Sequence, residues 1–166
     1  HQVYPLKGYW INLFGRIFPE VFDIEETFYH SEFDLRTYFT PDFSSFVTLA
    51  LRAGGSKVFG KYPFYGGATI GGKDNLRGYN NKRFSGDAAV FGQAEIRFLV
   101  TPLNLIFKSK IGLNLFAETG RVFTENDTSE KWHPSYGLGL WVSYLNSTII
   151  GSTYVACSAD RTTFNM

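Results

Sequence analysis

Cysteine is nearly absent from this chain of 166 residues: Cys157 is the single one, and methionine also occurs once. A lone cysteine excludes an internal disulfide framework and any cysteine-based metal site. The three histidines are scattered along the sequence and form no cluster of metal ligands. We therefore expect neither a metal site nor a cofactor.

Long apolar runs and a strong charge bias are missing as well. No run approaches the ~18 apolar residues of a membrane-spanning helix. The net charge of +1 suggests neither a nucleic-acid footprint nor a disordered acidic tail. Because no signal-peptide pattern begins at His1, we expect that an export signal was removed or that an upstream region is missing.

Aromatic residues are abundant, at 18% of the chain with 17 Phe and 10 Tyr, while charged residues make up only 19%. This composition is poor in helix formers and rich in residues favoured on pleated surfaces. The length indicates a single domain, residues 1–166. A mean hydropathy of -0.11 does not exclude a membrane protein, because a spanning barrel places its apolar residues at every second position.

Apolar and polar residues alternate with a period of two through most of the chain, which predicts antiparallel strands. One face is apolar and the opposite face carries charges of both signs. The apolar face includes Leu49, Leu51, Ile96, Leu113 and Leu140, and the polar face includes Arg16, Glu32, Asp34, Arg36, Arg52, Glu95, Arg97, Lys108, Lys110 and Glu118. A soluble sandwich could alternate in the same way. However, several runs exceed the ~9–11 residues that a tilted spanning strand needs, whereas soluble strands are usually ~5–6 residues long.

The connections between these segments also alternate in length. We expect short turns at 40–45, 101–104 and 145–148, and longer loops at 19–26, 60–87 and 124–133. Short periplasmic turns and long extracellular loops are typical of outer-membrane barrels. The sequence therefore predicts an all-β, antiparallel transmembrane β-barrel with its apolar face toward lipid.

The loop 60–87 is the longest interval without strand alternation. Loops of this length in a compact chain are usually functional. Its centre reads Gly-Gly-Lys-Asp-Asn-Leu-Arg-Gly-Tyr over residues 71–79. Because glycine adopts backbone shapes closed to other residues, the stretch indicates a fixed backbone that presents one arginine, Arg77.

The Leu-Arg-Gly-Tyr stretch resembles the signature loop of the BamA/TamA family of outer-membrane assembly barrels, also called the bacterial surface antigen family. Two later segments resemble the strands that follow in that family: 91–98, with the pair Glu95 and Arg97, and 116–123, with Glu118 and Gly120. Relatives commonly have Asp where this chain has Glu118. The specific resemblance covers residues 71–123, and the rest of the chain shares only the rhythm of strands and loops.

The resemblance implies that the chain is the C-terminal half of a sixteen-stranded barrel whose long loop folds into the lumen. In that family the loop arginine meets an acidic residue on the inner wall, so we expect Arg77 to approach Glu118, with Glu95 or Arg97 in the same network. The loop motif comprises Gly71, Gly72, Leu76, Arg77, Gly78 and Tyr79, and the inner-wall partners are Glu95, Arg97, Glu118 and Gly120.

The resemblance also implies a function without catalytic residues: insertion or assembly of outer-membrane proteins, or protein translocation, by an integral protein of the bacterial outer membrane. Its partners would be outer-membrane lipid, unfolded barrel or secreted client proteins, and possible periplasmic POTRA-type domains; no nucleic acid is expected. A passive pore, a surface antigen barrel, or the membrane anchor of an upstream enzyme domain remains the alternative.

Three motifs admit other interpretations. Residues 67–73 match a phosphate-binding loop, but Asp74 replaces the Ser or Thr that would hold magnesium, and no helix pattern follows. His30 and Ser31 cannot form a hydrolase dyad, because adjacent strand residues point to opposite faces. The pair Lys108 and Lys110 fits a solvated lumen wall or an anion-selective pore.

The number of strands predicts an incomplete barrel. We count seven full strands, and residues 162–166 are only the beginning of an eighth. An eight-stranded barrel is filled by its own side chains, which would leave no room for the loop 60–87. Because open edges are not tolerated in lipid, we expect the missing strands to come from an upstream half-barrel or from a second copy of the chain.

Overall fold

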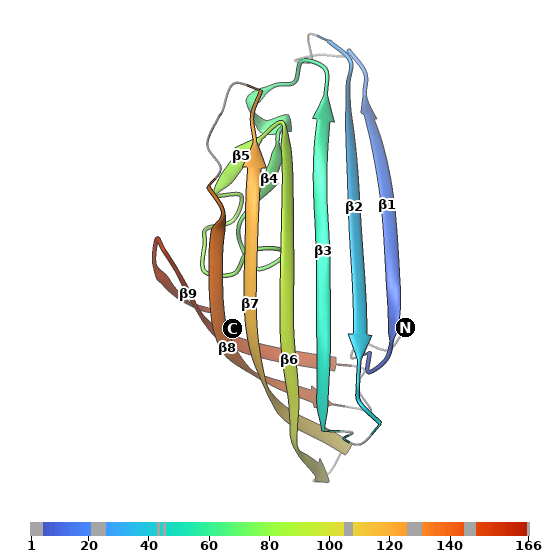
Figure 1. The fold of residues 1–166 in the computed structure, drawn as a ribbon, viewed down its shortest axis with the longest axis vertical. Coiled ribbons are helices and arrows are strands. Elements are labelled where there is room, and N and C mark those ends of the chain that lie inside the picture. Colours follow the sequence, from blue (N-terminus) through green and yellow to red (C-terminus); the bar gives the residue numbers. More distant parts are fainter. Residues whose placement is uncertain are drawn as a thin grey trace.

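The computed structural model describes residues 5–20, 26–42, 44, 46–104, 108–125, 131–144 and 149–165. One antiparallel sheet has the strand order β1-β2-β3-β6-β7-β8-β9-β10 (Figure 1). Its strands are β1 (Gly8–Phe18), β2 (Phe28–Phe39), β3 (Val47–Phe59), β6 (Ala88–Asn104), β7 (Lys108–Phe123), β8 (His133–Tyr144), β9 (Ile149–Ser158) and β10 (Thr162–Asn165). In the described part of the chain, no helix has the length and apolar character needed to cross a membrane.

The loop between β3 and β6 contains a 3-10 turn, η1 (Phe64–Gly66), and a second sheet of two short strands, β4 (Ala68–Ile70) and β5 (Phe84–Gly86). We call the sheet face that this loop contacts the inner face, and the opposite face the outer face. The interval 60–87 shows no strand alternation in the sequence. Its three-residue strands are too short to show alternation, which explains why the sequence did not reveal them.

The two faces of the sheet differ as the alternation predicts. On β7 the inner residues Asn114, Phe116 and Glu118 are buried, whereas the outer residues Leu113 and Leu115 are 42% and 50% exposed. The same periodicity places the apolar set on the outer face and the charged set on the inner face. Outer residues include Leu49, Leu51, Ile96 and Leu140, and inner ones include Arg52, Glu95 and Arg97. The side chain of Lys108 lies outside the described part.

A cluster of buried apolar side chains lies between the loop and the inner face. It comprises Phe28, Val58, Ala68, Ile70, Leu76, Tyr79 and Ala89. Four of these belong to the loop and three to strands of the sheet. Apolar burial therefore holds the loop against the inner face, in addition to any polar contact.

The predicted turn at 101–104 is wrong. Strand β6 continues through Asn104, where Thr101–Asn104 pair with Lys108–Ile111 of β7. The register shifts between Leu99 and Thr101, and such a bulge lets a strand accommodate a proline, here Pro102. Residues 105–107, which connect the two strands, lie outside the described part, as does the predicted turn 145–148.

The sheet has seven long strands and a short eighth, β10, of four residues. In the described residues β1 and β10 each pair with one neighbour only, so the sheet is open at both edges. Strong twist turns β9 across the long axis along which β1, β2 and β3 run (Figure 1). The structure is thus an all-β partial barrel.

Candidate functional site

The loop backbone around the arginine is built on glycines with positive φ: 123° at Gly71, 96° at Gly72 and 96° at Gly78. Gly72 and Leu76 exchange two backbone hydrogen bonds of 3.1 and 3.0 Å, which close a tight turn just before Arg77. L-residues with side chains rarely adopt this backbone region. Moreover, a Cβ at Gly71 would collide with the carbonyl oxygen of Asn80. These glycines therefore shape the segment that presents the arginine.

The residues that flank the arginine anchor the turn to the sheet. Leu76 is fully buried, and Tyr79 donates its hydroxyl hydrogen to the carbonyl oxygen of Pro134 at 3.0 Å. The carbonyl oxygen of Gly78 accepts a hydrogen bond of 2.8 Å from the hydroxyl of Ser158 in β9. A Cβ at Gly78 would lie 3.3 Å from the Cβ of Ser135. Glycine thus permits the loop backbone to approach β8 and β9 closely.

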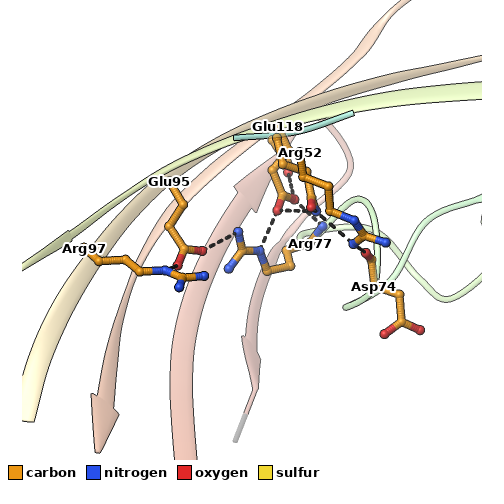
Figure 2. Close-up of polar contacts among 8 residues, drawn as sticks. Arg52, Asp74, Arg77, Glu95, Arg97 and Glu118 are labelled. Atoms are coloured by element: carbon orange, nitrogen blue, oxygen red, sulfur yellow. Dashed lines mark hydrogen bonds and ion pairs between the residues drawn. The ribbon is translucent and has the colours of Figure 1, made fainter. Parts of the chain in front are cut away.

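Arg77 contacts two carboxylates of the inner face (Figure 2). Its Nε donates to Oε1 of Glu118 at 2.6 Å, and its backbone N–H donates to Oε2 of the same residue, also at 2.6 Å. One terminal nitrogen reaches Glu95 at 3.1 Å. The guanidinium carbon lies 3.5 Å from the ring centroid of Phe116, which adds a cation–π contact on the face of the guanidinium.

The Glu118 carboxylate is enclosed, with a side chain that is 0% exposed. Besides the two Arg77 donors, it accepts hydrogen bonds from Nε2 of Gln93 at 3.0 Å and from the hydroxyl of Ser135 at 3.1 Å. Glu95 in turn accepts from Nε of Arg97 at 2.6 Å. The structure thus brings together Arg77, Glu118, Glu95 and Arg97, a set with two positive and two negative charges. A buried charge is stable when it is paired and hydrogen-bonded in this way.

Gly120 lies beside the apolar part of the loop and not among the polar residues of the site. A Cβ there would lie 2.8 Å from Cδ1 of Ile70 in β4. The glycine therefore makes room for the apolar part of the loop. Because it has no side chain, it makes no side-chain contact with Arg77.

The sequence did not predict a second polar contact between the loop and the inner face. Arg52 of β3 donates to the backbone carbonyl oxygen of Asp74 in the loop. Its guanidinium also donates to the carboxylate of Asp34 at 2.6 to 3.1 Å and to Gln93 at 3.3 Å. The sequence placed Arg52 on the inner face but gave it no partner in the loop.

One row of residues across five strands carries most of these contacts. The register aligns Arg52, Gln93, Glu118, Ser135 and Ser158 as direct neighbours on β3, β6, β7, β8 and β9. Each member donates either to the loop backbone or to Glu118, or is Glu118 itself. The anchor is therefore a continuous polar row, in which Glu118 is one member.

The two ends of the loop are joined to each other and to the end of β7. The hydroxyl of Tyr62 donates to Asp87, and the second oxygen of that carboxylate accepts a 2.6 Å hydrogen bond from the backbone N–H of Glu125. Burial raises the pKa of Tyr62 to about 12, and the hydrogen bond to Asp87 and the charge of that carboxylate act in the same direction. Asp87 thus ties the loop to the end of β7.

The stretch that matches a phosphate-binding loop and the pair of His30 and Ser31 form no catalytic or nucleotide-binding arrangement in the described structure. The stretch 67–73 forms β4 and a turn, without the helix of a phosphate-binding loop. His30 and Ser31 lie on opposite faces of β2, and Nδ1 of His30 is 3.2 Å from Glu32. In the residues that the structure describes, no group of three His, Cys, Asp or Glu side chains is arranged to hold a metal ion.

Comparison with known proteins assigns a family. The model of the Omp85 superfamily domain matches residues 1–144, which include strands β1 to β8 and the anchored loop. A search of curated proteins found no match. Members of the superfamily, which includes the BamA/TamA-type barrels, are outer-membrane proteins that insert or translocate other proteins. The match covers most of the chain and the sheet is all-β, and we conclude that the chain belongs to the Omp85 superfamily.

Proposed function

We propose that this chain forms part of an outer-membrane barrel that inserts and assembles other barrel proteins, or moves proteins across the membrane, without a catalytic group. The observation that carries the proposal is the loop bound to the inner face through Arg77 and Glu118. Its second support is the membership of an insertase and translocase family.

The anchored loop favours this function over a passive pore. A pore needs an open, water-filled lumen, whereas β4 packs against β3, β6 and β7, and β5 packs against β6 and β7. Leu76 and Ile70 are almost fully buried there. A loop fixed in this way fills space that an ion channel would leave open.

The open edge of the sheet at β1 indicates that the chain needs a partner strand. The N–H and C=O groups along one side of β1 have no strand partner among the described residues, and unpaired backbone groups are not tolerated in lipid. We propose that β1 pairs with a strand of an upstream half-barrel or of a second copy of the chain. Unfolded barrel or secreted proteins would be the clients, and POTRA-type domains could deliver them.

Reconstitution of the full chain tests the function. Vesicles of phosphatidylethanolamine and phosphatidylglycerol, with or without the protein, receive a urea-unfolded eight-stranded barrel protein as client. The folded fraction is followed by its shifted mobility in unheated gels. We expect the protein to raise the folding rate of the client, and the Glu118→Ala variant to lose most of that gain. The Lys110→Gln variant, altered at the opposite end of β7, serves as the matched control.

A contrary result would be equally clear. If the client folds no faster with the protein than with empty vesicles, the insertion proposal is wrong. Steady ion conductance of the same preparation across a planar bilayer would then identify a passive pore.

A further inference from the structure

The loop is held at two places that lie three residues apart in the sequence. Arg77 binds Glu118 of β7, and the backbone carbonyl oxygen of Asp74 accepts a hydrogen bond from Arg52 of β3 (Figure 2). The two strands are not neighbours, because β6 lies between them. Among the described residues, no hydrogen bond or ion pair joins Arg52 directly to Glu118. Any connection between these two anchors therefore passes through β6 or through the loop itself.

Gln93 of β6 lies between the two anchor residues. The register places it opposite Arg52 on one side and opposite Glu118 on the other. Its amide oxygen accepts a hydrogen bond from Arg52 at 3.3 Å, and its amide nitrogen donates to Glu118 at 3.0 Å. A reversed amide would direct its N–H groups at the guanidinium and its oxygen at the carboxylate, where neither could form a hydrogen bond. The charges on the two sides therefore fix a single orientation of the amide.

The atoms that Gln93 contacts are the same atoms that hold the loop. Nη1 of Arg52 donates both to Gln93 and to the carbonyl oxygen of Asp74. Oε1 of Glu118 accepts both from Gln93 and from Nε of Arg77. These four hydrogen bonds and the backbone from Asp74 to Arg77 form a closed ring. Within this ring, Gln93 is the link between the two anchor residues of the sheet.

The surroundings of the ring favour its opening as a unit. Gln93 is half-buried, and the Glu118 side chain is fully enclosed. In such surroundings hydrogen bonds in a chain strengthen one another, and a polar group that loses its partner is costly. If Arg52 turns away, the amide oxygen of Gln93 loses its donor, and the amide is no longer held toward Glu118. The loss of one anchor therefore weakens the other.

We propose that Gln93 is a positioning residue that couples the two anchors, so that residues 74–77 are held against the inner face and released from it as one unit. Gln93 acts through Arg52 and Glu118, because its hydrogen bonds go to these two side chains. The alternative is that Gln93 only fills space between two independent anchors. The coupling concerns how the loop is held, so it stands whether or not the barrel inserts client proteins.

Hydrogen exchange of the loop measures the coupling. The full chain is reconstituted in vesicles of phosphatidylethanolamine and phosphatidylglycerol, and exchange of the amides in 71–83 is followed by mass spectrometry. Arg52→Ala, Glu118→Ala and the double variant are compared with the parent. Independent anchors would accelerate exchange by factors that multiply. Because effects within one hydrogen-bond network are not additive in free energy, we expect the double variant to fall short of that product by about threefold or more.

The same four proteins are then prepared with Gln93→Met, which keeps the length of the side chain and removes both of its hydrogen bonds. In this background we expect the two factors to multiply. An equal shortfall in both backgrounds would show that Gln93 only fills space, and factors that multiply in the parent would show that the anchors are independent. Either result would overturn the proposal. Should Gln93→Met fail to fold, Gln93→Ala takes its place and is interpreted in the same way.

Asn114 supplies the matched control. It lies on the inner face of β7, is 8% exposed, and has an amide oxygen without a hydrogen-bond partner among the described residues. Asn114→Ala leaves the ring intact and should leave the shortfall unchanged. A loss of the shortfall in this background as well would overturn the proposal, because a general loss of packing would then explain both results.

Discussion

Strand β7 has two faces that follow opposite rules. On the inner face Glu118 has a fully enclosed side chain with four hydrogen-bond donors, whereas on the outer face Leu115, three residues before it, is 50% exposed. A soluble sheet would bury the leucine and expose the carboxylate. An exposed leucine is expected of a strand that faces lipid, as in the outer-membrane barrels of this family, and the carboxylate is stable only because its partners are already in place. The inner face therefore depends on specific pairs, and the outer face only on apolar character.

The largest effect on stability is expected from removing the Glu118 carboxylate of the inner face. Glu118→Ala leaves the Arg77 guanidinium, whose side chain is only 13% exposed, without its main partner. Breaking a buried pair costs about 3–5 kcal/mol, which should appear as a lower free energy of unfolding in urea titrations of the reconstituted protein. Hydrogen exchange of the amides in 71–83 should accelerate.

A double variant tests whether the lost stability comes from the pair of Arg77 and Glu118 or from a general loss of packing. Because Arg77→Ala and Glu118→Ala remove the same interaction, the double variant should be little less stable than either single variant. Fully additive losses would show that the two residues act independently and that the pair is not the anchor.

The second-largest effect is expected on the outer face. Leu113→Arg places a guanidinium among lipid tails, at a cost of ~2–4 kcal/mol near the bilayer mid-plane. Tyr38→Arg, at a half-buried inner position beside Arg97, is the comparison and should cost less. Unfolding titrations in bilayers measure both, and an equal cost for the two variants would contradict the assignment of faces.

A smaller effect is expected from the second loop contact. Arg52→Ala removes the hydrogen bond to the Asp74 carbonyl oxygen and leaves Asp34 with Arg36 as its remaining arginine partner. Hydrogen bonds to charged groups contribute about 1.5–3 kcal/mol. Limited proteolysis of the loop should become faster than in the parent but slower than in Glu118→Ala. A cleavage rate equal to that of the parent would show that the Arg52 contact does not help to anchor the loop.

The smallest effect concerns pH. The pKa of Tyr62 is raised to about 12 in the folded protein, above the ~10 of an unfolded tyrosine. Its neutral form therefore stabilises the fold fully below pH ~10, and this contribution is lost as the pH rises through about 12. Absorbance titration at alkaline pH should show one tyrosine that ionises late, and Tyr62→Phe should remove that component. If the variant keeps it, the hydroxyl is not held by Asp87.

Parts of the site were predictable because the evidence for them is local. The glycines at 71, 72 and 78 and the arginine they present stand within nine residues, and the inward phase of Glu118 follows from the alternation of β7 alone. The predicted turn at Thr101 failed because a local Thr-Pro signal was overridden by pairing with β7, which continues the strand across a bulge. Likewise, β4 and β5 are stabilised by burial against the sheet and show no pattern of their own.

What the sequence determined by itself is which residues face which way, since a period of two is set residue by residue along each strand. Only the tertiary structure decided which inner residues become neighbours. Arg52, Gln93, Glu118, Ser135 and Ser158 are separated by up to 106 positions (158 − 52), yet they form one row. Register is a property of strand pairs, and a slip of one residue would turn a whole strand to the other face. The row that anchors the loop therefore exists only once all five strands are paired.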